Sequence, residues 1–214
     1  MTVVPPRGVL FDFGGVIWDM RWDVARALEE AHGLPRGAIF KTLYGAPAWR
    51  EVECGRGDRE AWLAGAHAEL EAEAGRALPP LHAEWRGAGV LIHRNVELIR
   101  SLRPPYRLAV VSNADATLRS RLSDGLGIAG LFDEIVCSAE VGCAKPDAAI
   151  YDLACQRLGL PPQACVFVDD NEPNVRAAEA LGIRGVLFRV DRGDDLRSQL
   201  AAVGVVPRAM NQGG

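Results

Sequence analysis

Lysine is nearly absent from this chain. Of the 24 basic residues, only Lys41 and Lys145 are lysine, and the other 22 are arginine. A lysine kept against this bias suggests a position that needs a compact ammonium group rather than the planar guanidinium of arginine. Acidic residues outnumber basic ones, and the formal net charge is −4. This balance argues against a nucleic acid or an anionic membrane surface as the main partner.

The sequence also lacks long apolar runs and a targeting segment. No run approaches the roughly 18–20 apolar residues that span a bilayer. Residues 1–8 do not place an apolar region after a charged one, as a signal peptide does. We therefore expect a cytoplasmic protein without a membrane partner. The composition leaves monomer and homodimer equally open.

Cysteine pairs with metal-ligand spacing are missing too. The five cysteines form no CxxC pair, and an odd number does not suit a disulfide framework. Cysteine in an apolar segment usually behaves as a small hydrophobic residue. We therefore expect all five to be buried and chemically inert: Cys54, Cys137, Cys143, Cys155 and Cys165. The four histidines lack ligand spacing, and we expect surface or packing positions for them: His32, His67, His82 and His93.

The chain does have the composition of a packed globule, with 49% hydrophobic and 24% charged residues. Short apolar runs bounded by turn formers are typical of strands buried on both faces of a sheet. Five such runs cover residues 9–13, 108–111, 134–137, 165–168 and 186–188. Segments of helical length separate the later runs, at residues 116–126, 148–158 and 173–181. This alternation predicts an α/β fold, a Rossmann-like parallel sheet with helices on both faces, in three layers.

One connection is far longer than a crossover between parallel strands needs. Roughly 95 residues separate the first predicted strand from the second, and they are rich in helix formers, as at residues 22–31, 38–44 and 59–74. We therefore predict a helical domain over residues 18–90, inserted into a core domain of residues 1–17 and 91–214. Residues 95–102 would form the helix that returns to the sheet.

All five tryptophans lie within the predicted insert. Most are expected to fill its core. Trp18 and Trp22 are close in sequence to Asp12, so either could instead roof a pocket above the strand ends. Three basic residues of the insert could line the same pocket: Arg21, Lys41 and Arg50.

Polar residues follow four of the predicted strands, in chain order Asp12, the pair Ser112–Asn113, Lys145, and the pair Asp169–Asp170. In an open parallel sheet, ligands bind at the carboxyl ends of the strands, near the point where the strand order reverses. A single polar strand end has an ordinary explanation, because such residues cap helices. Four that meet at one edge of the sheet predict a functional site.

The three carboxylates of this set need a counter-charge. Two like charges about 4 Å apart repel by about 4 kcal/mol at an effective dielectric constant of 20. A divalent cation removes this repulsion, and Mg²⁺ prefers oxygen ligands together with several waters. Lys145 supplies a further positive charge, and the helix that begins after Ser112 and Asn113 offers free N–H groups to an anion. Such a set can move a phosphoryl group, or let an aspartate displace a group at carbon.

These residues resemble, in order and spacing, the four motifs of the haloacid dehalogenase-like (HAD) hydrolase superfamily: Asp12 with Gly15 and Val16, Ser112–Asn113, Lys145–Pro146, and VFVDDNEPNV at residues 166–175. The resemblance spans nearly the whole chain. The insert resembles the helical C1 cap of subfamily I, which includes phosphoglycolate phosphatases, sugar-phosphatases and 2-haloacid dehalogenases. The motifs do not encode the substrate.

The resemblance implies a role for each matched residue. Asp12 would be the nucleophile that forms an aspartyl-phosphate. Ser112, with Asn113 beside it, would hold the phosphoryl oxygens, and Lys145 would neutralise and position both nucleophile and phosphate.

The resemblance also implies a set of metal ligands. Mg²⁺ would bind Asp12, Asp170 and the backbone carbonyl of Gly14, with Asp169 helping through a water. Asp19 matches a further acidic position of the first motif, with a hinge or structural role.

One position departs from the family pattern. Most phosphatases of the superfamily carry a second aspartate two residues after the nucleophile, which protonates the leaving group and then activates water. That residue is Gly14 here. General acid–base assistance contributes on the order of 100- to 10,000-fold. We therefore expect a preference for good leaving groups, or a proton carrier recruited from the insert or from the substrate.

Three functions are compatible with these motif residues. The first is a magnesium-dependent phosphatase that acts on a small phosphorylated metabolite. A metal-independent 2-haloacid dehalogenase could use the same aspartate, but the Asp169–Asp170 pair beside a carboxylate substrate would be unfavourable without a cation. A non-catalytic relative that binds a phosphorylated ligand is favoured by Gly14 and disfavoured by the retained nucleophile and lysine.

Overall fold

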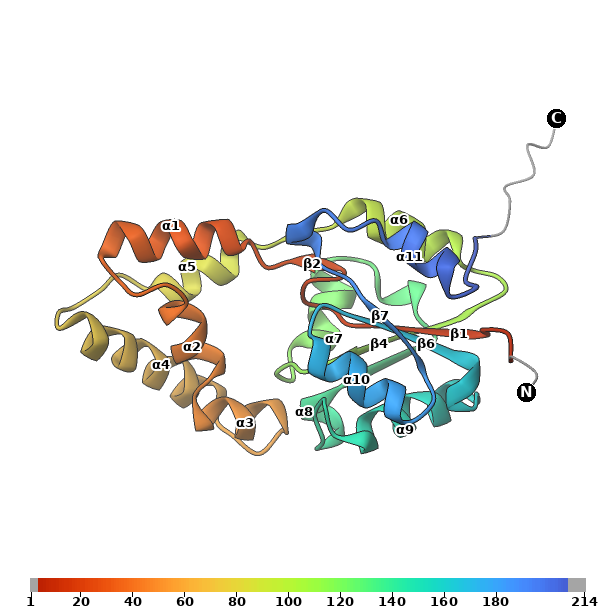
Figure 1. Cartoon of the computed structure of the whole chain (residues 1–214). Helices are drawn as coiled ribbons and strands as arrows, with labels where there is room; N and C mark the ends of the chain where they lie inside the picture. Colours follow the sequence, from red (N-terminus) through yellow and green to blue (C-terminus); the bar gives the residue numbers. More distant parts are fainter. Residues whose placement is uncertain (1–3, 208–214) are drawn as a thin grey trace.

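The computed structural model describes residues 4–207 and contains a five-stranded parallel sheet (Figure 1). Its strands lie in the order β5-β4-β1-β6-β7, and all neighbouring pairs are parallel. The strand order reverses between β1 and β6, which is where open α/β sheets bind ligands. The strands are β1 (Gly8–Phe11), β4 (Arg107–Ser112), β5 (Glu134–Cys137), β6 (Cys165–Asp169) and β7 (Arg184–Leu187).

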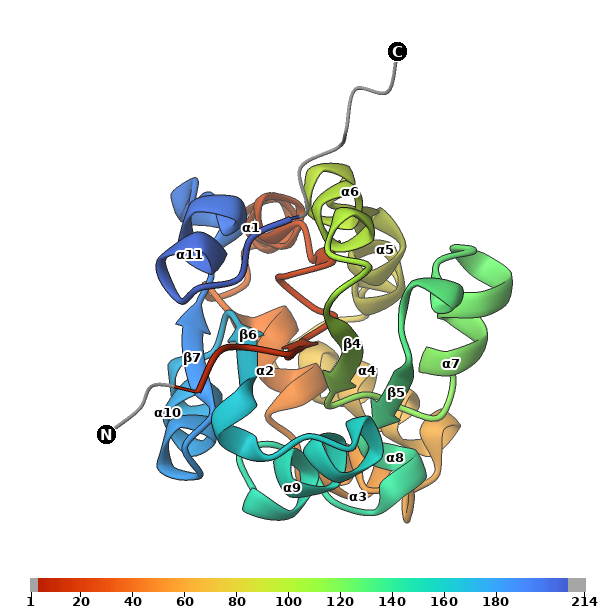
Figure 2. The ribbon, with the colours of Figure 1, turned by 90° about the vertical axis from the view of Figure 1, so that its right-hand side faces the viewer.

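Helices cover both faces of this sheet, which confirms the predicted three-layer α/β fold (Figure 2). Successive side chains of a strand point to opposite faces. In β1, Val9 and Phe11 therefore join one hydrophobic cluster, and Leu10 joins the other. The first cluster includes residues of α6 (His93–Ser101) and α11 (Leu196–Ala202), and the second includes residues of α9 (Ala148–Leu158) and α10 (Glu172–Ala180).

The strand predictions are confirmed with ends shifted by at most two residues, but the helix predicted over residues 116–126 differs. The backbone N–H of Thr117 donates to Asp115 Oδ1 at 2.9 Å, which holds these residues in a turn. A short helix, α7 (Leu118–Ser120), then continues as a π-helical segment, η1 (Arg121–Gly125). Apolar spacing does not distinguish a π-helical turn from an α-helical one. The remaining short helices of the core are α8 (Ser138–Val141) and the 3₁₀ turns η2 (Ala129–Leu131), η3 (Pro162–Ala164) and η4 (Val190–Arg192).

Between β1 and β4 the chain forms a separate helical body, which we call the helical insert (Figure 1). Trp49, Trp62 and Trp85 lie in its own hydrophobic cluster and are buried. Trp62 also donates its indole N–H to the carbonyl of Leu43 at 2.6 Å. Three of the five tryptophans thus fill the core of the insert. Its helices are α1 (Trp22–His32), α2 (Ala38–Tyr44), α3 (Pro47–Glu53), α4 (Arg59–Ala74) and α5 (Leu81–Ala88).

Two short strands connect the helical insert to the sheet. In this ladder, β2 (Trp18–Asp19) pairs antiparallel with β3 (Val90–Leu91). Strands of two residues carry no readable periodicity, so the sequence did not predict them. They lie at the predicted boundaries after residue 17 and near residue 90, and the division into two domains there stays a prediction.

The expectation of five buried cysteines is wrong for two of them. Cys137, Cys155 and Cys165 are buried, whereas Cys54 and Cys143 are partly exposed. Both exposed cysteines lie in loops, which run over the surface of a protein, rather than in apolar strands. Within residues 4–207, no helix is both long and apolar enough to cross a membrane.

We expect Leu10→Ala to lower the free energy of unfolding by about 2–5 kcal/mol, because Leu10 is fully buried and its truncation leaves a cavity. Urea denaturation followed by circular dichroism measures this change. The control Val206→Ala alters an exposed side chain and should stay within about 0.5 kcal/mol of the wild type. Equal losses in the two variants would contradict the central position of β1.

Candidate active site

The carboxyl ends of three neighbouring strands carry the predicted polar residues to one edge of the sheet. Asp12 follows β1 directly, Ser112 ends β4, and Asp169 ends β6 with Asp170 after it. Since β1 lies between β4 and β6, Asp12 lies between the other two strand ends. The loop between α8 and α9 adds Lys145. The structure thus brings four charged residues from distant parts of the sequence into one place.

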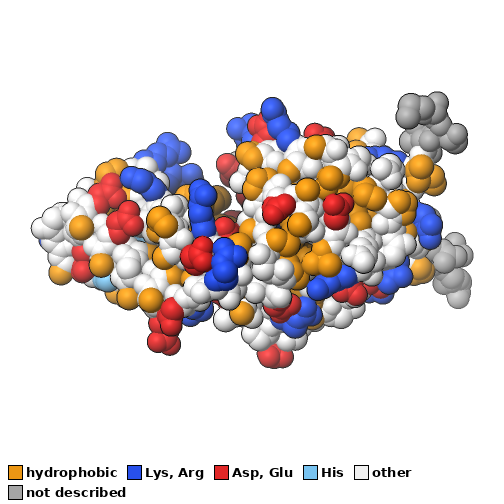
Figure 3. Space-filling view, turned by 90° about the horizontal axis from the view of Figure 1, so that it is seen from below, with side chains coloured by type: hydrophobic (Ala, Val, Ile, Leu, Met, Phe, Trp, Pro, Cys, Tyr) orange, Lys and Arg blue, Asp and Glu red, His pale blue; other side chains and the backbone are white. Residues whose placement is uncertain are grey.

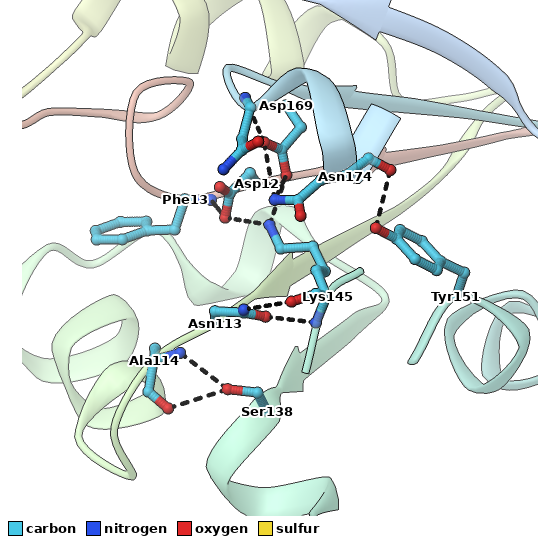
Figure 4. Close-up of polar contacts among 10 residues, drawn as sticks. Asp12, Phe13, Asn113, Ala114, Ser138, Lys145, Tyr151, Asp169 and Asn174 are labelled. Carbon is cyan, nitrogen blue, oxygen red and sulfur yellow. Dashed lines mark hydrogen bonds and ion pairs between the residues drawn. The ribbon is translucent and has the colours of Figure 1, made fainter. Parts of the chain in front are cut away.

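Lys145 is at the centre of this site. Its ammonium group lies 2.9 Å from Asp12 Oδ1 and 2.6 Å from Asp169 Oδ2 (Figure 4). The lysine side chain is only 1% exposed. Burial works to lower the pKa of Lys145, but the two carboxylates outweigh it and hold this pKa well above its ordinary value. Lys145 is therefore a permanent positive charge at this edge of the sheet.

The two carboxylate oxygens of Asp12 have different surroundings. Oδ1 contacts the Lys145 ammonium group and accepts a hydrogen bond from the backbone N–H of Phe13 at 2.6 Å. Neither contact involves Oδ2, which makes Oδ2 the oxygen available for attack on an incoming group. Burial outweighs the attraction of Lys145 and raises the pKa of Asp12 to about 6, with a further contribution from Asp169. Asp12 is thus a more basic carboxylate than an ordinary aspartate.

Asp169 is fully buried and held on both oxygens. Besides Lys145, it accepts hydrogen bonds from the backbone N–H of Asn171 at 2.8 Å and from the side-chain amide of Asn174 at 3.1 and 3.3 Å. The carbonyl of Asn174 in turn accepts a hydrogen bond from the Tyr151 hydroxyl at 2.9 Å (Figure 4). Because protein donors use both of its oxygens, Asp169 is suited to orienting Lys145 and to acting on a cation through a water.

Asp170 lies against the glycine turn that follows β1. A Cβ added to Gly15 would come within 2.1 Å of Asp170 Oδ2, and Gly15 has a φ of +71°. Both the space and the backbone conformation therefore require glycine at this position. Burial raises the pKa of Asp170 to about 7, and the nearby Asp12 and Asp169 add to the rise.

The acidic residues fit a metal ion. Asp12, Asp169 and Asp170 each place one carboxylate oxygen within 4.8 Å of the others. Burial is the main cause of the raised pKa of Asp12 and of Asp170, and the charges of neighbouring carboxylates add to it. Three carboxylates here face one ammonium group. A cation would restore this balance, and a donor set made only of oxygen suits Mg²⁺.

Asn113 fastens the loop that carries Lys145. Its side-chain amide donates to the Lys145 carbonyl at 2.9 Å, and its amide oxygen accepts from the Lys145 backbone N–H at 2.8 Å (Figure 4). The backbone N–H of Ala114 likewise donates to Ser138 Oγ at 3.0 Å. These bonds fix Lys145 relative to the end of β4. The predicted contacts of Asn113 and Ser112 with a substrate stay predictions.

Three other residues considered from the sequence lie apart from this site. Asp19 Oδ1 accepts a hydrogen bond from the backbone N–H of Arg21 at 2.8 Å. Arg21 has a φ of +54°, which is uncommon for a residue with a side chain, so Asp19 stabilises the turn into α1. The Arg21 side chain pairs with Asp23 at 2.7 Å, and Lys41 is exposed. Neither basic residue reaches the strand ends.

A protein-family model described as haloacid dehalogenase-like hydrolase matches residues 6–182. The chain belongs to the haloacid dehalogenase-like hydrolases. The matched region includes the helical insert and all four sets of polar strand-end residues. The protein is therefore an enzyme, and its class is that of a hydrolase.

Curated relatives of this hydrolase include phosphatases. The D-ribitol-5-phosphate phosphatase of Bacteroides thetaiotaomicron is 25% identical over 92% of this chain and 98% of the relative. The acyl-CoA dehydrogenase family member 10 of Mus musculus is 28% identical over 92% of this chain, but the chain spans only 19% of that protein. This hydrolase likewise spans less than half the length of several other relatives that it matches.

Solved structures share the fold of this hydrolase. A HAD family enzyme of Bacteroides thetaiotaomicron, in complex with magnesium and inorganic phosphate, has a TM-score of 0.68 at 19% identity, over 90% of this chain and 98% of that chain. The L-2-haloacid dehalogenase of Xanthobacter autotrophicus, with chloropropionic acid covalently bound, has a TM-score of 0.62 at 21% identity, over 94% and 85%. At these identities the agreement shows the fold and does not separate the two activities.

Sequence reasoning missed the residues that surround the charged centre. Asn174 lies within the fourth motif, at residues 166–175, but no role was predicted for it, and Tyr151 lies within a predicted helix where nothing in the pattern marks it. Three arginines were also missed, namely Arg59 and Arg86 of the helical insert, which pair with Asp115, and Arg121 of the core, which lies over the Phe13 ring. Since 22 of 24 basic residues are arginine, the presence of an arginine at a given position does not indicate a functional role in this sequence.

Gly15→Ala should destabilise the hydrolase, because the new Cβ would overlap the Asp170 carboxylate and the positive φ would strain the backbone. We expect the free energy of unfolding to fall by about 1–3 kcal/mol, measured by urea denaturation. Gly14→Ala is a matched control, since its Cβ would meet nothing closer than Met20 Sδ at 3.6 Å. A loss in Gly14→Ala as large as that in Gly15→Ala would refute the crowding of position 15 by Asp170.

Proposed function

We propose that this hydrolase is a magnesium-dependent phosphatase of a small phosphorylated metabolite, and that it acts through an aspartyl-phosphate on Asp12. One observation carries the proposal. Lys145 holds one oxygen of Asp12, while the other oxygen stays available in a group of three carboxylates that could hold a cation. The phosphatase among its relatives and the magnesium and phosphate in a structure of the same fold support it.

The proposed reaction has two displacements. Oδ2 of Asp12 forms a bond to phosphorus, and the bond between phosphorus and the ester oxygen breaks as the alcohol leaves. Water then cleaves the aspartyl-phosphate, which releases inorganic phosphate and restores the carboxylate. Lys145 stabilises the negative charge that Asp12 and the phosphoryl group bring together. Ser112, at the end of β4, is proposed to hold a phosphoryl oxygen with its hydroxyl.

The proposed magnesium site uses residues on both sides of the switch point in the sheet. Asp12, Asp170 and the backbone carbonyl of Gly14 would hold the ion, with Asp169 acting through a water. When bound, Mg²⁺ supplies charge neutralisation that lets an anionic nucleophile approach an anionic phosphate. We further propose that residues 18–90 act as a cap domain over this edge of the sheet.

Dehalogenation of a 2-haloacid is the second candidate, since a dehalogenase shares the fold. In that reaction Asp12 would attack carbon without a metal. The position of Asp170 disfavours it, because this carboxylate lies so close to Asp12 and Asp169 that their charges add to the effect of burial and raise the pKa of Asp170. A carboxylate substrate would add a further negative charge to the same place.

Asp12→Asn should lower phosphate release from p-nitrophenyl phosphate by at least about 1,000-fold, because an amide cannot form the acyl phosphate. Removal of Mg²⁺ with EDTA should abolish the wild-type activity, and added Mg²⁺ should restore it. Phosphate release with and without Mg²⁺, and chloride release from 2-chloropropionate, are measured side by side.

The control Asp152→Asn removes an exposed carboxylate of α9 and should keep wild-type turnover. Unchanged turnover in Asp12→Asn would exclude Asp12 as the nucleophile. Metal-independent chloride release would establish the dehalogenase instead. Absence of both products would favour a non-catalytic relative that binds a phosphorylated ligand.

A further inference from the structure

The guanidinium group of Arg121 lies over two aromatic rings, one of which belongs to the residue that follows Asp12. Its guanidinium carbon lies 4.1 Å from the centre of the Trp18 ring and 5.0 Å from that of Phe13. Phe13 is the residue that follows Asp12. Arg121 is half-buried, and none of the ion pairs formed within residues 4–207 involves it. The aromatic faces stabilise the cation but leave its hydrogen-bond donors without an acidic partner.

Two arginines of the helical insert contact the loop that follows β4. Arg59 of α4 and Arg86 of α5 lie 3.0 and 3.7 Å from Asp115 Oδ2. Asp115 is buried and belongs to the loop that follows Ser112 at the end of β4. Burial lowers the pKa of Arg121, and the charge of Arg86 lowers it further.

We call Arg59, Arg86 and Arg121 the arginine cluster. Two of its three positive charges pair with one carboxylate, that of Asp115, and Arg121 forms no ion pair within residues 4–207, which leaves two positive charges in excess. Basic and acidic side chains gather where the helical insert meets the sheet (Figure 3). Partly buried charges of one sign are unfavourable unless an opposite charge joins them. The arrangement is therefore suited to an anion that enters between the insert and the sheet.

We propose that the arginine cluster binds a carboxylate of the substrate, so that the substrates are phosphorylated carboxylic acids. Arg121 and Arg86 would contact this carboxylate, because the planar guanidinium matches its two oxygens. The phosphoryl group would lie at Asp12, one residue from the Phe13 ring that supports Arg121. This inference rests on the proposed phosphatase function and names its substrate class.

The test compares two substrates that differ in one group. In 3-phosphoglycerate the carboxylate stands where sn-glycerol 3-phosphate has a hydroxymethyl group. We expect the wild-type kcat/KM to be at least about tenfold higher for 3-phosphoglycerate. Arg121→Gln should lower that value by about 10- to 100-fold, the usual worth of a hydrogen bond to a charged group. Its kcat/KM for glycerol 3-phosphate and for p-nitrophenyl phosphate should change less than about threefold.

Arg119→Gln is the matched control, since Arg119 lies two residues away and pairs with Glu140 on the surface. Equal wild-type kcat/KM for the two substrates, or an equal loss for both in Arg121→Gln, would overturn the proposal. Calorimetric titration of both compounds measures the same preference without turnover. A wild-type chain that releases no phosphate but binds 3-phosphoglycerate more tightly, through Arg121, would refute the proposed function and keep this inference.

Discussion

The contact of Lys145 with two carboxylates is the interaction on which the rest of the site depends. A lysine that is almost fully buried would be strongly unfavourable without opposite charges beside it. Asp12 and Asp169 supply them from neighbouring strands, β1 and β6, that meet where the strand order reverses. The reciprocal bonds between Asn113 and the Lys145 backbone add a third strand end. Lys145 thus links three strand ends, two through its ammonium group and one through its backbone.

This geometry gives different surroundings to three carboxylates that look equivalent in the sequence. Asp169 is saturated by protein donors and is a support, whereas Asp12 keeps one oxygen without such a contact. Asp170 has no room to move towards the glycine turn, because it already fills the space above Gly15. Hydrogen bonds and ion pairs therefore distinguish a supporting carboxylate from the one that we propose as the nucleophile, and even the adjacent Asp169 and Asp170 have different surroundings.

The sequence predicted the parts of the site that lie at strand ends. Buried strands have a strong local pattern, and a polar residue that ends such a strand is placed by the sheet itself, so the positions of Asp12, Asp169 and Asp170 followed. Lys145 was conspicuous only because lysine is so rare here.

Residues placed by tertiary contacts were not predictable in this way. Arg59 and Arg86 reach Asp115 only through the position of the helical insert. The two-residue ladder of β2 and β3 and the close contact of Gly55 with α8 connect this insert to the core. Arg121 begins a π-helical segment that apolar spacing does not distinguish from an α-helix. The cysteine prediction failed at Cys54 and Cys143 for a related reason, since loop exposure is set by packing and not by residue type.

The ion pairs of Asp115 with Arg59 and Arg86 also tie the helical insert to the sheet. Pairs with one partly exposed partner contribute only about 0.2–1 kcal/mol each, and dissolved ions screen them, with a Debye length of about 8 Å at physiological ionic strength. Separation of the insert from the sheet breaks both pairs. The packing of the helical insert against the sheet therefore becomes less favourable as ionic strength rises, because its two ion pairs with Asp115 weaken.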